Sequence, residues 1–379
     1  MKMIEKEPIF KNPIIITRPV MVNLDELSLQ LREVWESGWL TNNGYKHQEL
    51  EALIKNEIFN GFSTSLVTNA TIGLLIALKT LDIEGEVITT PFTFPATAHA
   101  ISWAGLKPVF CDVDPLTMNI DANKIEELIT DKTSAIMGVH VFGNPCDVEK
   151  IDQIAKKNNL KVIYDAAHAF ELEINGRSIV NYGDVSVFSF HATKLFHTVE
   201  GGAIVFKDEK LKGKCDIIKN FGIKGDDVIE CGINGKMNEL QASVGLLMMK
   251  KKEDERMARK IVRDIYIENL SKINGIILPN IARSVTKNSL QYFVIRIDAE
   301  KFGKTRNDVF DELKRNNVFA RKYFYPLCTN FKHYSDQKYV VPVAEKIAEQ
   351  VLCLPFHSGL SKDDVLGIAE IIKSISKIK

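Results

Sequence analysis

The chain has 379 residues, and its 49 lysines and arginines balance 49 aspartates and glutamates. With 45% hydrophobic and 26% charged residues, the composition is that of a globular protein rather than a disordered one. Zero net charge argues against a protein that wraps nucleic acid. No uncharged apolar stretch approaches the roughly 18 residues of a membrane-spanning helix. The length predicts about two domains.

Cysteine usage and the N-terminal segment bear on the cellular compartment. The six cysteines form no CxxC pair, and their spacing matches no zinc site. The first 20 residues hold only a short apolar run at 13–16 and do not resemble a signal peptide. We therefore expect a cytoplasmic protein whose cysteines are small core residues.

Short β-branched runs alternate with helical patterns through the first 206 residues. Strands are predicted at 64–68, 86–90, 108–112, 134–141, 162–165, 185–189 and 203–206. Helices are predicted at 70–81, from Pro95 onward, at 123–129, and after Asp147, which we expect to cap its helix. This alternation is typical of a mostly parallel sheet covered on both faces, and so of an α/β protein.

The pattern changes near residue 236. A single long helix is predicted from 238 to about 270, with a charged middle that we expect to face solvent. Beyond it, strands are predicted at 276–278 and 290–297, and helices at 306–316, 343–351 and 362–375. We therefore divide the chain into a large domain, 1–245, and a small C-terminal α/β domain, 246–379, joined by the long helix.

An acid and a lysine follow neighbouring strands of the predicted sheet. Asp165 ends the strand in KVIYDAAHAF, and Lys194 lies on a short connection after the next strand. Taken alone, the aspartate could cap a helix and the lysine could be a solvated cation. Together at the carboxyl edge of a sheet, they match the needs of pyridoxal phosphate, which requires a lysine for a Schiff base and an acid beside its ring nitrogen.

A phosphate site is predicted at the strand-to-helix junction 67–71, where backbone N–H groups and the Thr71 hydroxyl could hold an anion. No GxGxxG or GxxxxGK[ST] motif occurs, which disfavours a nicotinamide-dependent oxidoreductase and P-loop chemistry. His140, His168, His191 and His197 form no HExxH motif or carboxylate triad, so we predict no metal site.

The chain resembles, from end to end, the DegT/DnrJ/EryC1/StrS family of sugar aminotransferases. The motifs that carry the resemblance are SGWLTNNG at 37–44, EVITTPFTFPATAHA at 86–100, GNPCDVEKI at 143–151, YDAAHAF at 164–170, SFHATKLFHTVEGGAIV at 189–205 and GINGKMNELQASVG at 232–245. The resemblance implies the fold type I, aspartate aminotransferase-like architecture, in which a mostly parallel central sheet is followed by a smaller C-terminal α/β domain.

The resemblance also implies roles for individual residues toward the cofactor pyridoxal 5′-phosphate. Lys194 matches the Schiff-base lysine, and Asp165 matches the partner of the pyridine nitrogen. His168 matches the residue beside the ring and its phenolic oxygen, and Phe94 an aromatic side chain stacked on the ring. The residues matching the phosphate site are Ala70, Thr71 and Ser189.

Other matching positions imply a homodimer with shared active sites. The loop at 232–236 matches the segment that enters the neighbouring subunit, with Asn234 or Lys236 reaching the phosphate or the substrate. The residues matching the nucleotide-sugar site are Thr41, Arg321, Tyr323 and Tyr325, of which the two tyrosines could equally serve packing.

The implied reaction moves an amino group from L-glutamate to a nucleotide-linked keto-deoxysugar. The motifs are most similar to those of enzymes that convert dTDP-4-dehydro-6-deoxyglucose to dTDP-4-amino-4,6-dideoxyglucose, which family usage links to the O-antigen of lipopolysaccharide. Two alternatives stay open: a 3-aminotransferase acting on the 3-keto isomer, and a non-catalytic regulator that binds pyridoxal phosphate. The retained lysine and acid argue against the regulator.

Overall fold

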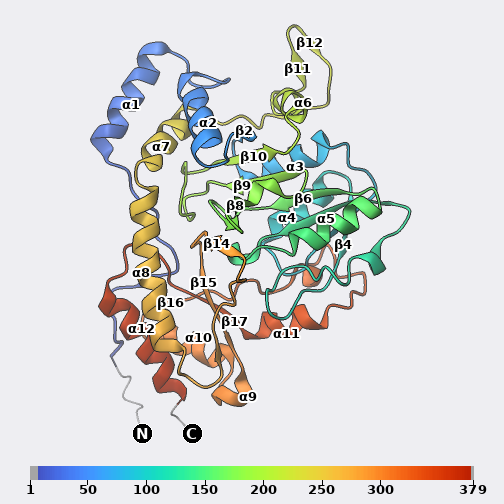
Figure 1. The fold of residues 1–379 in the computed structure, drawn as a ribbon. Coiled ribbons are helices and arrows are strands. Elements are labelled where there is room, and N and C mark those ends of the chain that lie inside the picture. The colour runs from blue at the N-terminus through green and yellow to red at the C-terminus, as the bar shows by residue number, and fades with distance from the viewer. Residues whose placement is uncertain (1–6, 377–379) are drawn as a thin grey trace.

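The computed structural model describes residues 7–376 and confirms the α/β architecture. Figure 1 shows a large sheet flanked by helices, a long helix, α8, running beside it, and a smaller lobe built by the C-terminal part of the chain. Residues 1–6, part of the segment in which we expected no signal peptide, lie outside the described residues.

The central sheet has seven strands in the order β2-β10-β9-β6-β5-β3-β4. Their bounds are β2 (Ser63–Val67), β3 (Glu86–Thr89), β4 (Lys107–Phe110), β5 (Thr133–Val139), β6 (Lys161–Asp165), β9 (Val185–Ser189) and β10 (Gly202–Phe206). All seven predicted strands are present. β10 runs opposite to the other six strands of this sheet, because the connection at 190–201 is too short to hold a crossover helix.

Helices cover the sheet on both faces (Figure 1). They are α3 (Ala70–Thr80), α4 (Pro95–Trp103), α5 (Val148–Lys157) and α6 (Lys210–Ile218). The Asp147 side chain accepts a hydrogen bond from Lys150 N, which confirms it as the cap of α5. The helix predicted at 123–129 is wrong, because the segment forms only the 3₁₀ turn η1 (Glu126–Leu128). So short a segment gains too few hydrogen bonds to offset helix nucleation.

The predicted helix at 238–270 is in fact two helices, α7 (Glu239–Met249) and α8 (Lys252–Leu270), separated at residues 250–251. They pack on different parts of the molecule. The apolar α7 packs against α1 (Leu24–Ser37) and α2 (Tyr45–Glu57), whereas α8 packs against α12 (Lys362–Ser376). The break lets each helix follow its own partners.

The charged run at the start of α8 was predicted to face solvent, which holds for Glu253, Asp254 and Lys260 but is wrong for the rest of the run. Glu255 and Arg259 are buried and pair at 2.5 Å between Oε1 and Nε. Lys252 and Arg256 both contact Glu171, a buried carboxylate in the segment before β7. These charges therefore lie at an interface within the molecule, which a helical charge pattern alone does not reveal.

The smaller lobe contains a three-stranded antiparallel sheet of β13 (Ile276–Ile277), β15 (Phe293–Ile297) and β17 (Val351–Leu354). Its helices are α9 (Ala299–Phe302), α10 (Arg306–Arg315), α11 (Pro342–Gln350) and α12. Minor elements are β1 (Ile14–Ile15) paired with β16 (Val318–Phe319), β7 (Glu173–Ile174) with β8 (Arg177–Ser178) and β14 (Val285–Lys287), β11 (Ile223–Lys224) with β12 (Asp227–Val228), and the turns η2 (Val141–Gly143), η3 (Ile179–Asn181) and η4 (Cys328–Asn330).

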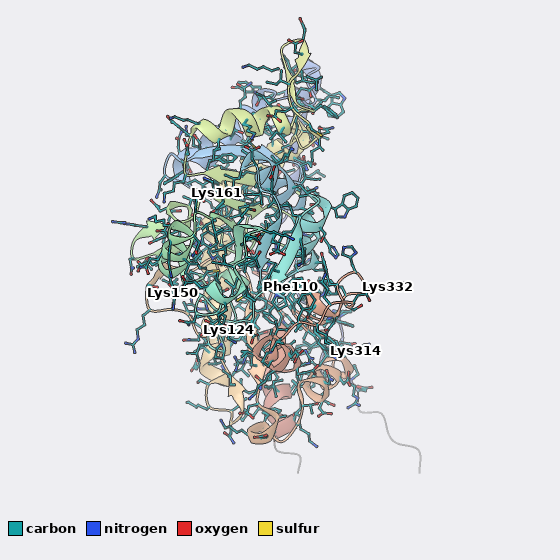
Figure 2. All side chains as sticks on the ribbon, turned by 90° about the vertical axis from the view of Figure 1, so that its right-hand side faces the viewer. Phe110, Lys124, Lys150, Lys161, Lys314 and Lys332 are labelled. Atoms are coloured by element: carbon teal, nitrogen blue, oxygen red, sulfur yellow. The ribbon has the colours of Figure 1, made fainter. Side chains whose placement is uncertain are left out.

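One cysteine and several lysines lie at the surface. Five cysteines are buried, but Cys231 is exposed, so the prediction of six core cysteines is wrong at that position. Exposed lysines such as Lys161, Lys314 and Lys332 come from separate elements (Figure 2). Within residues 7–376, no helix has the length and apolarity to cross a bilayer, and no group of three acidic, histidine or cysteine side chains forms a metal site.

Candidate active site

A cavity of about 590 Å³ opens at the carboxyl ends of β5, β6 and β9. The segment 321–324 of the smaller lobe forms its opposite wall. Nine of the sequence-predicted site residues line it: Ala70, Thr71, Phe94, Asp165, His168, Ser189, Lys194, Arg321 and Tyr323. The structure thus brings the predicted lysine and acid into one cavity.

Asp165 is the last residue of β6, and its carboxylate is almost fully buried. Its Oδ2 accepts a hydrogen bond from the Thr97 hydroxyl at 2.7 Å, and its Oδ1 accepts one from Ala167 N at 3.1 Å. Burial raises the pKa of Asp165, and these two hydrogen bonds together with the charge of Lys194 oppose that rise. The carboxylate is therefore held by fixed donors while facing the cavity.

Lys194 ends a tight turn, residues 191–194, within the connection from β9 to β10. Its backbone N–H donates to His191 O at 2.8 Å. The buried amide of Gln291 clamps both flanking residues, because Gln291 Nε2 donates to Thr193 O and Gln291 Oε1 accepts from Leu195 N, each at 3.1 Å. A side chain next to β15 therefore fixes the backbone that presents the lysine.

The surroundings of Lys194 favour its neutral amine. Burial lowers the pKa of Lys194 to about 8, although the charge of Asp165 opposes the shift. Its Nζ lies 5.6 Å from the centre of the Tyr292 ring, an apolar neighbour. A lysine with a pKa near 8 has a substantial neutral fraction close to neutral pH, which a nucleophile or proton carrier requires.

His168 lies beside these groups in a defined tautomer. Burial lowers the pKa of His168 well below its usual value, so the ring is neutral. Phe142 N donates to His168 Nδ1 at 3.3 Å, which assigns the ring proton to Nε2. The Tyr292 ring packs edge-on against the imidazole, with centroids 4.9 Å apart. The arrangement leaves an N–H donor available on the far side of the ring.

The N-terminus of α3 borders the cavity with unused backbone donors. The Asn69 side chain caps the helix by accepting from Ile72 N, and Asn69 O accepts from Gly73 N. The N–H groups of Ala70 and Thr71 have no partner within the helix, so together they suit an anion. Gly202 permits this packing, because a Cβ there would lie 2.7 Å from Phe188 O and 3.0 Å from Ala70 N.

The mouth of the cavity is aromatic and cationic. The Arg321 guanidinium donates to the Tyr323 hydroxyl and lies over that ring, 5.1 Å from its centre. Tyr325 lines a neighbouring open cleft of about 570 Å³, which shares Phe94, Arg321 and Tyr323 with the cavity. Tyr325 therefore lies beside the site rather than inside it.

Besides Tyr325, three further predicted residues lie outside the cavity of their own chain. Thr41 is exposed. Asn234 pairs with Asn220 in an isolated β-bridge, and Lys236 Nζ donates to Asn220 Oδ1 at 2.7 Å. Lys236 lines a separate polar pocket of about 560 Å³. Within one chain these residues do not meet Lys194.

Comparison with known proteins identifies the family. A profile of the DegT/DnrJ/EryC1/StrS aminotransferase family matches residues 23–373. The chain belongs to this family. It is 44% identical over 368 residues to the dTDP-4-amino-4,6-dideoxy-D-glucose transaminase of Shigella dysenteriae, covering 96% of this chain and all of the relative. An enzyme of the same name from Escherichia coli is 42% identical, with 94% and 97% coverage.

Solved structures agree with this assignment. DesI, crystallised in the presence of its TDP-sugar product, superposes with a TM-score of 0.93 at 32% identity, covering 98% of this chain and 95% of DesI. The present member of the DegT/DnrJ/EryC1/StrS family is thus a sugar aminotransferase, and pyridoxal phosphate is its cofactor. The prediction of the family, the fold and the cofactor is confirmed.

The cavity of this family member suits that cofactor in its donor chemistry. It combines an amine that is partly neutral near pH 8, a buried carboxylate and a helix N-terminus with unused N–H groups. Gly202 keeps this N-terminus clear of side-chain atoms from β10. The residues present therefore fit an aldehyde, a basic ring nitrogen and a phosphate.

Sequence reasoning missed the residues that support this constellation. Tyr292 and Gln291 lie within the segment predicted as a strand, and Thr97 lies within the quoted motif TFPAT. A Thr-x-x-x-Thr spacing at the start of a helix is a usable signal for paired hydroxyls on one face. Nothing in the local sequence indicates that Gln291 reaches the turn at Lys194, nearly a hundred residues away.

Proposed function

We propose that the protein transfers an amino group from L-glutamate to C4 of dTDP-4-dehydro-6-deoxyglucose and so forms dTDP-4-amino-4,6-dideoxyglucose. The observation that carries the proposal is that Lys194 and the buried Asp165 line one cavity, in a chain that aligns nearly end to end with transaminases of that name. Their shared product name favours C4 over C3 amination.

Each cavity residue has a proposed task. The bound cofactor supplies an electron-accepting ring and an aldehyde. Lys194 would hold the aldehyde carbon and, once released as a neutral amine, move protons on one face of the substrate. Asp165 would keep a proton at the ring nitrogen. The Nε2–H of His168 would donate to the phenolic oxygen, and its neutral state avoids a second cation beside Lys194.

The phosphate and the substrate would bind at opposite ends of the cavity. Ala70 N, Thr71 and Ser189 would hold the cofactor phosphate, and Phe94 would stack on the ring. Arg321 is the fixed cation at the mouth, suited to the carboxylate of glutamate or a nucleotide phosphate. Tyr323 orients that guanidinium through their hydrogen bond. Tyr325, in the adjoining cleft, would contact the nucleotide.

The working unit is proposed to be a homodimer with shared sites. Exposed large apolar side chains gather on α1 and the loop after it, where Trp35 and Trp39 are 61% and 58% exposed. A second copy would cover such a surface. Thr41 lies on that loop, and Asn234 and Lys236 lie on another surface segment. Within the dimer these residues would complete the partner's cavity.

A subunit-mixing experiment tests the sharing. Lys194→Ala and Asn234→Ala subunits, each inactive alone, should regain about a quarter of wild-type activity after unfolding and refolding in an equal mixture, since half the dimers would carry one intact site. Size-exclusion chromatography checks that both variants assemble. Assembled mixtures that stay inactive would contradict shared sites.

The position of amination is tested with purified protein, pyridoxal phosphate, L-glutamate and either the 4-keto or the 3-keto dTDP-sugar. We expect turnover of the 4-keto sugar, release of 2-oxoglutarate and nitrogen on C4 by NMR. Preference for the 3-keto sugar would replace the proposal with the 3-aminotransferase alternative. Binding of the cofactor without turnover of either sugar would favour the non-catalytic regulator.

The cellular setting proposed is the cytoplasm, with the product destined for a bacterial surface glycan such as an O-antigen. All six cysteines are free, as a reducing compartment requires. Localisation of a tagged protein by cell fractionation tests this setting, and recovery outside the cytoplasmic fraction would contradict it.

A further inference from the structure

Two threonines, Thr97 of α4 and Thr93 of the turn before it, are hydrogen-bonded in series to the carboxylate of Asp165. The Thr97 hydroxyl is 2.7 Å from Asp165 Oδ2, and the Thr93 hydroxyl is 2.9 Å from the Thr97 hydroxyl. Both threonines are buried. Thr97 does not line the cavity, whereas Asp165 and Thr93 do. Thr97 therefore touches the carboxylate from the protein side only.

The direction of these hydrogen bonds follows from counting protons. A threonine hydroxyl has one proton to donate and can also accept. An ionised Asp165 can only accept, so Thr97 donates its proton to Oδ2. Thr97 can then only accept from Thr93, which donates. Each bond in such a chain polarises the next, and the chain ends on the carboxylate.

The local fold explains why the hydroxyls meet. Thr93 and Thr97 are four residues apart across the start of α4, where Pro95 occupies the first turn. Phe94, between them, turns toward the cavity. The segment 93–97 thus supplies the Phe94 ring to the site and two linked hydroxyls, of which that of Thr97 contacts Asp165.

We propose that Thr97, supported by Thr93, is a positioning residue that holds Asp165 as a carboxylate and so keeps the proton on the ring nitrogen of the cofactor. The proposal rests on the proposed function of Asp165. A buried carboxyl facing a basic nitrogen can share its proton in two ways, as a neutral acid beside a neutral ring or as a carboxylate beside a protonated ring. A hydroxyl donor on the carboxylate stabilises the second arrangement.

The test removes the Thr97 hydroxyl and measures whether the ring nitrogen of the cofactor carries a proton. Pyridoxal phosphate labelled with ¹⁵N in the ring is bound to wild type and to Thr97→Val, which keeps the shape of threonine but lacks the donor. The ¹⁵N chemical shift reports whether the ring nitrogen is protonated. We expect Thr97→Val to move the proton equilibrium toward the neutral ring by roughly tenfold to a hundredfold.

Kinetics separate this role from packing. Thr97→Val should lower kcat for the glutamate half-reaction about tenfold or more, with little change in KM because Thr97 does not line the cavity. Thr97→Ser should restore both the ¹⁵N signal and kcat. The matched control is Thr80→Val, a buried threonine of α3 that donates to Ile76 O, and it should leave both unchanged.

A double variant tests whether Thr93 acts through its hydrogen bond to Thr97. Thr93→Val should shift the ¹⁵N signal in the same direction but less, and Thr93→Val with Thr97→Val should match Thr97→Val alone, because Thr93 acts through Thr97. A wild-type ¹⁵N signal in folded Thr97→Val, or a loss that Thr97→Ser fails to restore, overturns the inference. Wild type that binds no cofactor or makes no amino sugar instead overturns the proposed function.

Discussion

Two regions of the molecule bury charged side chains, and they treat those charges in opposite ways. On α8, Arg259 is paired with Glu255 at 2.5 Å and also donates to the carbonyl oxygens of Leu290 and Gln291. In the cavity, Lys194 rests near the face of Tyr292, and burial lowers its pKa to about 8. The charges on α8 stabilise the fold, whereas the cavity holds an amine whose lowered pKa lets it lose its proton near neutral pH.

Burial of a charge has a different consequence on α8 than in the cavity, because the charges are paired to different extents. Pairing on α8 offsets the desolvation of the two charges, and Arg259 also holds the segment that carries Gln291 by donating to its backbone. Gln291 in turn clamps the turn at Lys194. Incomplete pairing in the cavity leaves part of the desolvation uncompensated, and the lysine responds with a lowered pKa. The charged pair on α8 therefore helps to position Lys194, acting through Gln291.

The largest expected effect follows from removing the reactive amine. Lys194→Ala should lower turnover about 10⁴-fold or more, because the Lys194 amine is proposed both to hold the cofactor and to move protons. Turnover with glutamate and the 4-keto sugar measures the loss, and circular dichroism confirms the fold. A folded Lys194→Ala variant within tenfold of wild type would refute the assignment.

Breaking the paired region should instead cost stability. Arg259→Met leaves Glu255 buried without its partner and should lower the free energy of unfolding by about 3–5 kcal/mol, measured by urea denaturation. Glu255→Leu combined with Arg259→Met removes both charges and should recover most of that loss. If the double variant is no more stable than the single one, the uncompensated charge is not the cause.

The two regions also differ in how far the sequence predicts them. Asp165 and Lys194 were predictable because strand ends and short connections converge at one edge of a parallel sheet. Burial of Glu255 and Arg259 was not, since a charged helical run reads the same whether it faces water or a segment 31 residues away. The break between α7 and α8 likewise depends on tertiary partners, which local periodicity does not encode.

Helix and strand types were more predictable than boundaries and short elements. The strands of the central sheet carry short apolar runs that contain β-branched residues, so all seven were predictable from the sequence pattern. The segment 123–129 has helical spacing, yet Asp121 bonds the backbone and side chain of Asn123 and favours a turn. Contacts across the sequence, such as Phe142 N to His168, had no local signal.

The pH dependence of cofactor capture should report the lowered pKa of Lys194. A neutral amine attacks the aldehyde, so the capture rate by cofactor-free protein should rise with pH and level off above about 8, the folded-state pKa. Stopped-flow absorbance with pyridoxal phosphate measures the rate. A rise that continues to a midpoint near 10.5, the ordinary lysine value, would show that burial does not tune the amine.

The smallest effect is expected at an exposed pair. Lys156 and Asp152 on α5 are 2.6 Å apart, but the lysine side chain is 74% exposed. Lys156→Ala should therefore change the free energy of unfolding by less than about 0.5 kcal/mol and leave turnover unchanged. A change above 1 kcal/mol by urea denaturation would mean that exposure does not separate weak pairs from the α8 pair.

The central claim is that Lys194 is the reactive amine, and reductive trapping tests it most directly. Purified protein is incubated with pyridoxal phosphate, reduced with borohydride, digested and mapped by mass spectrometry. We predict one stable adduct, on the peptide containing Lys194, with lysines outside the cavity, such as Lys212 and Lys219, unmodified. An adduct on another lysine, or none at all, would contradict the account.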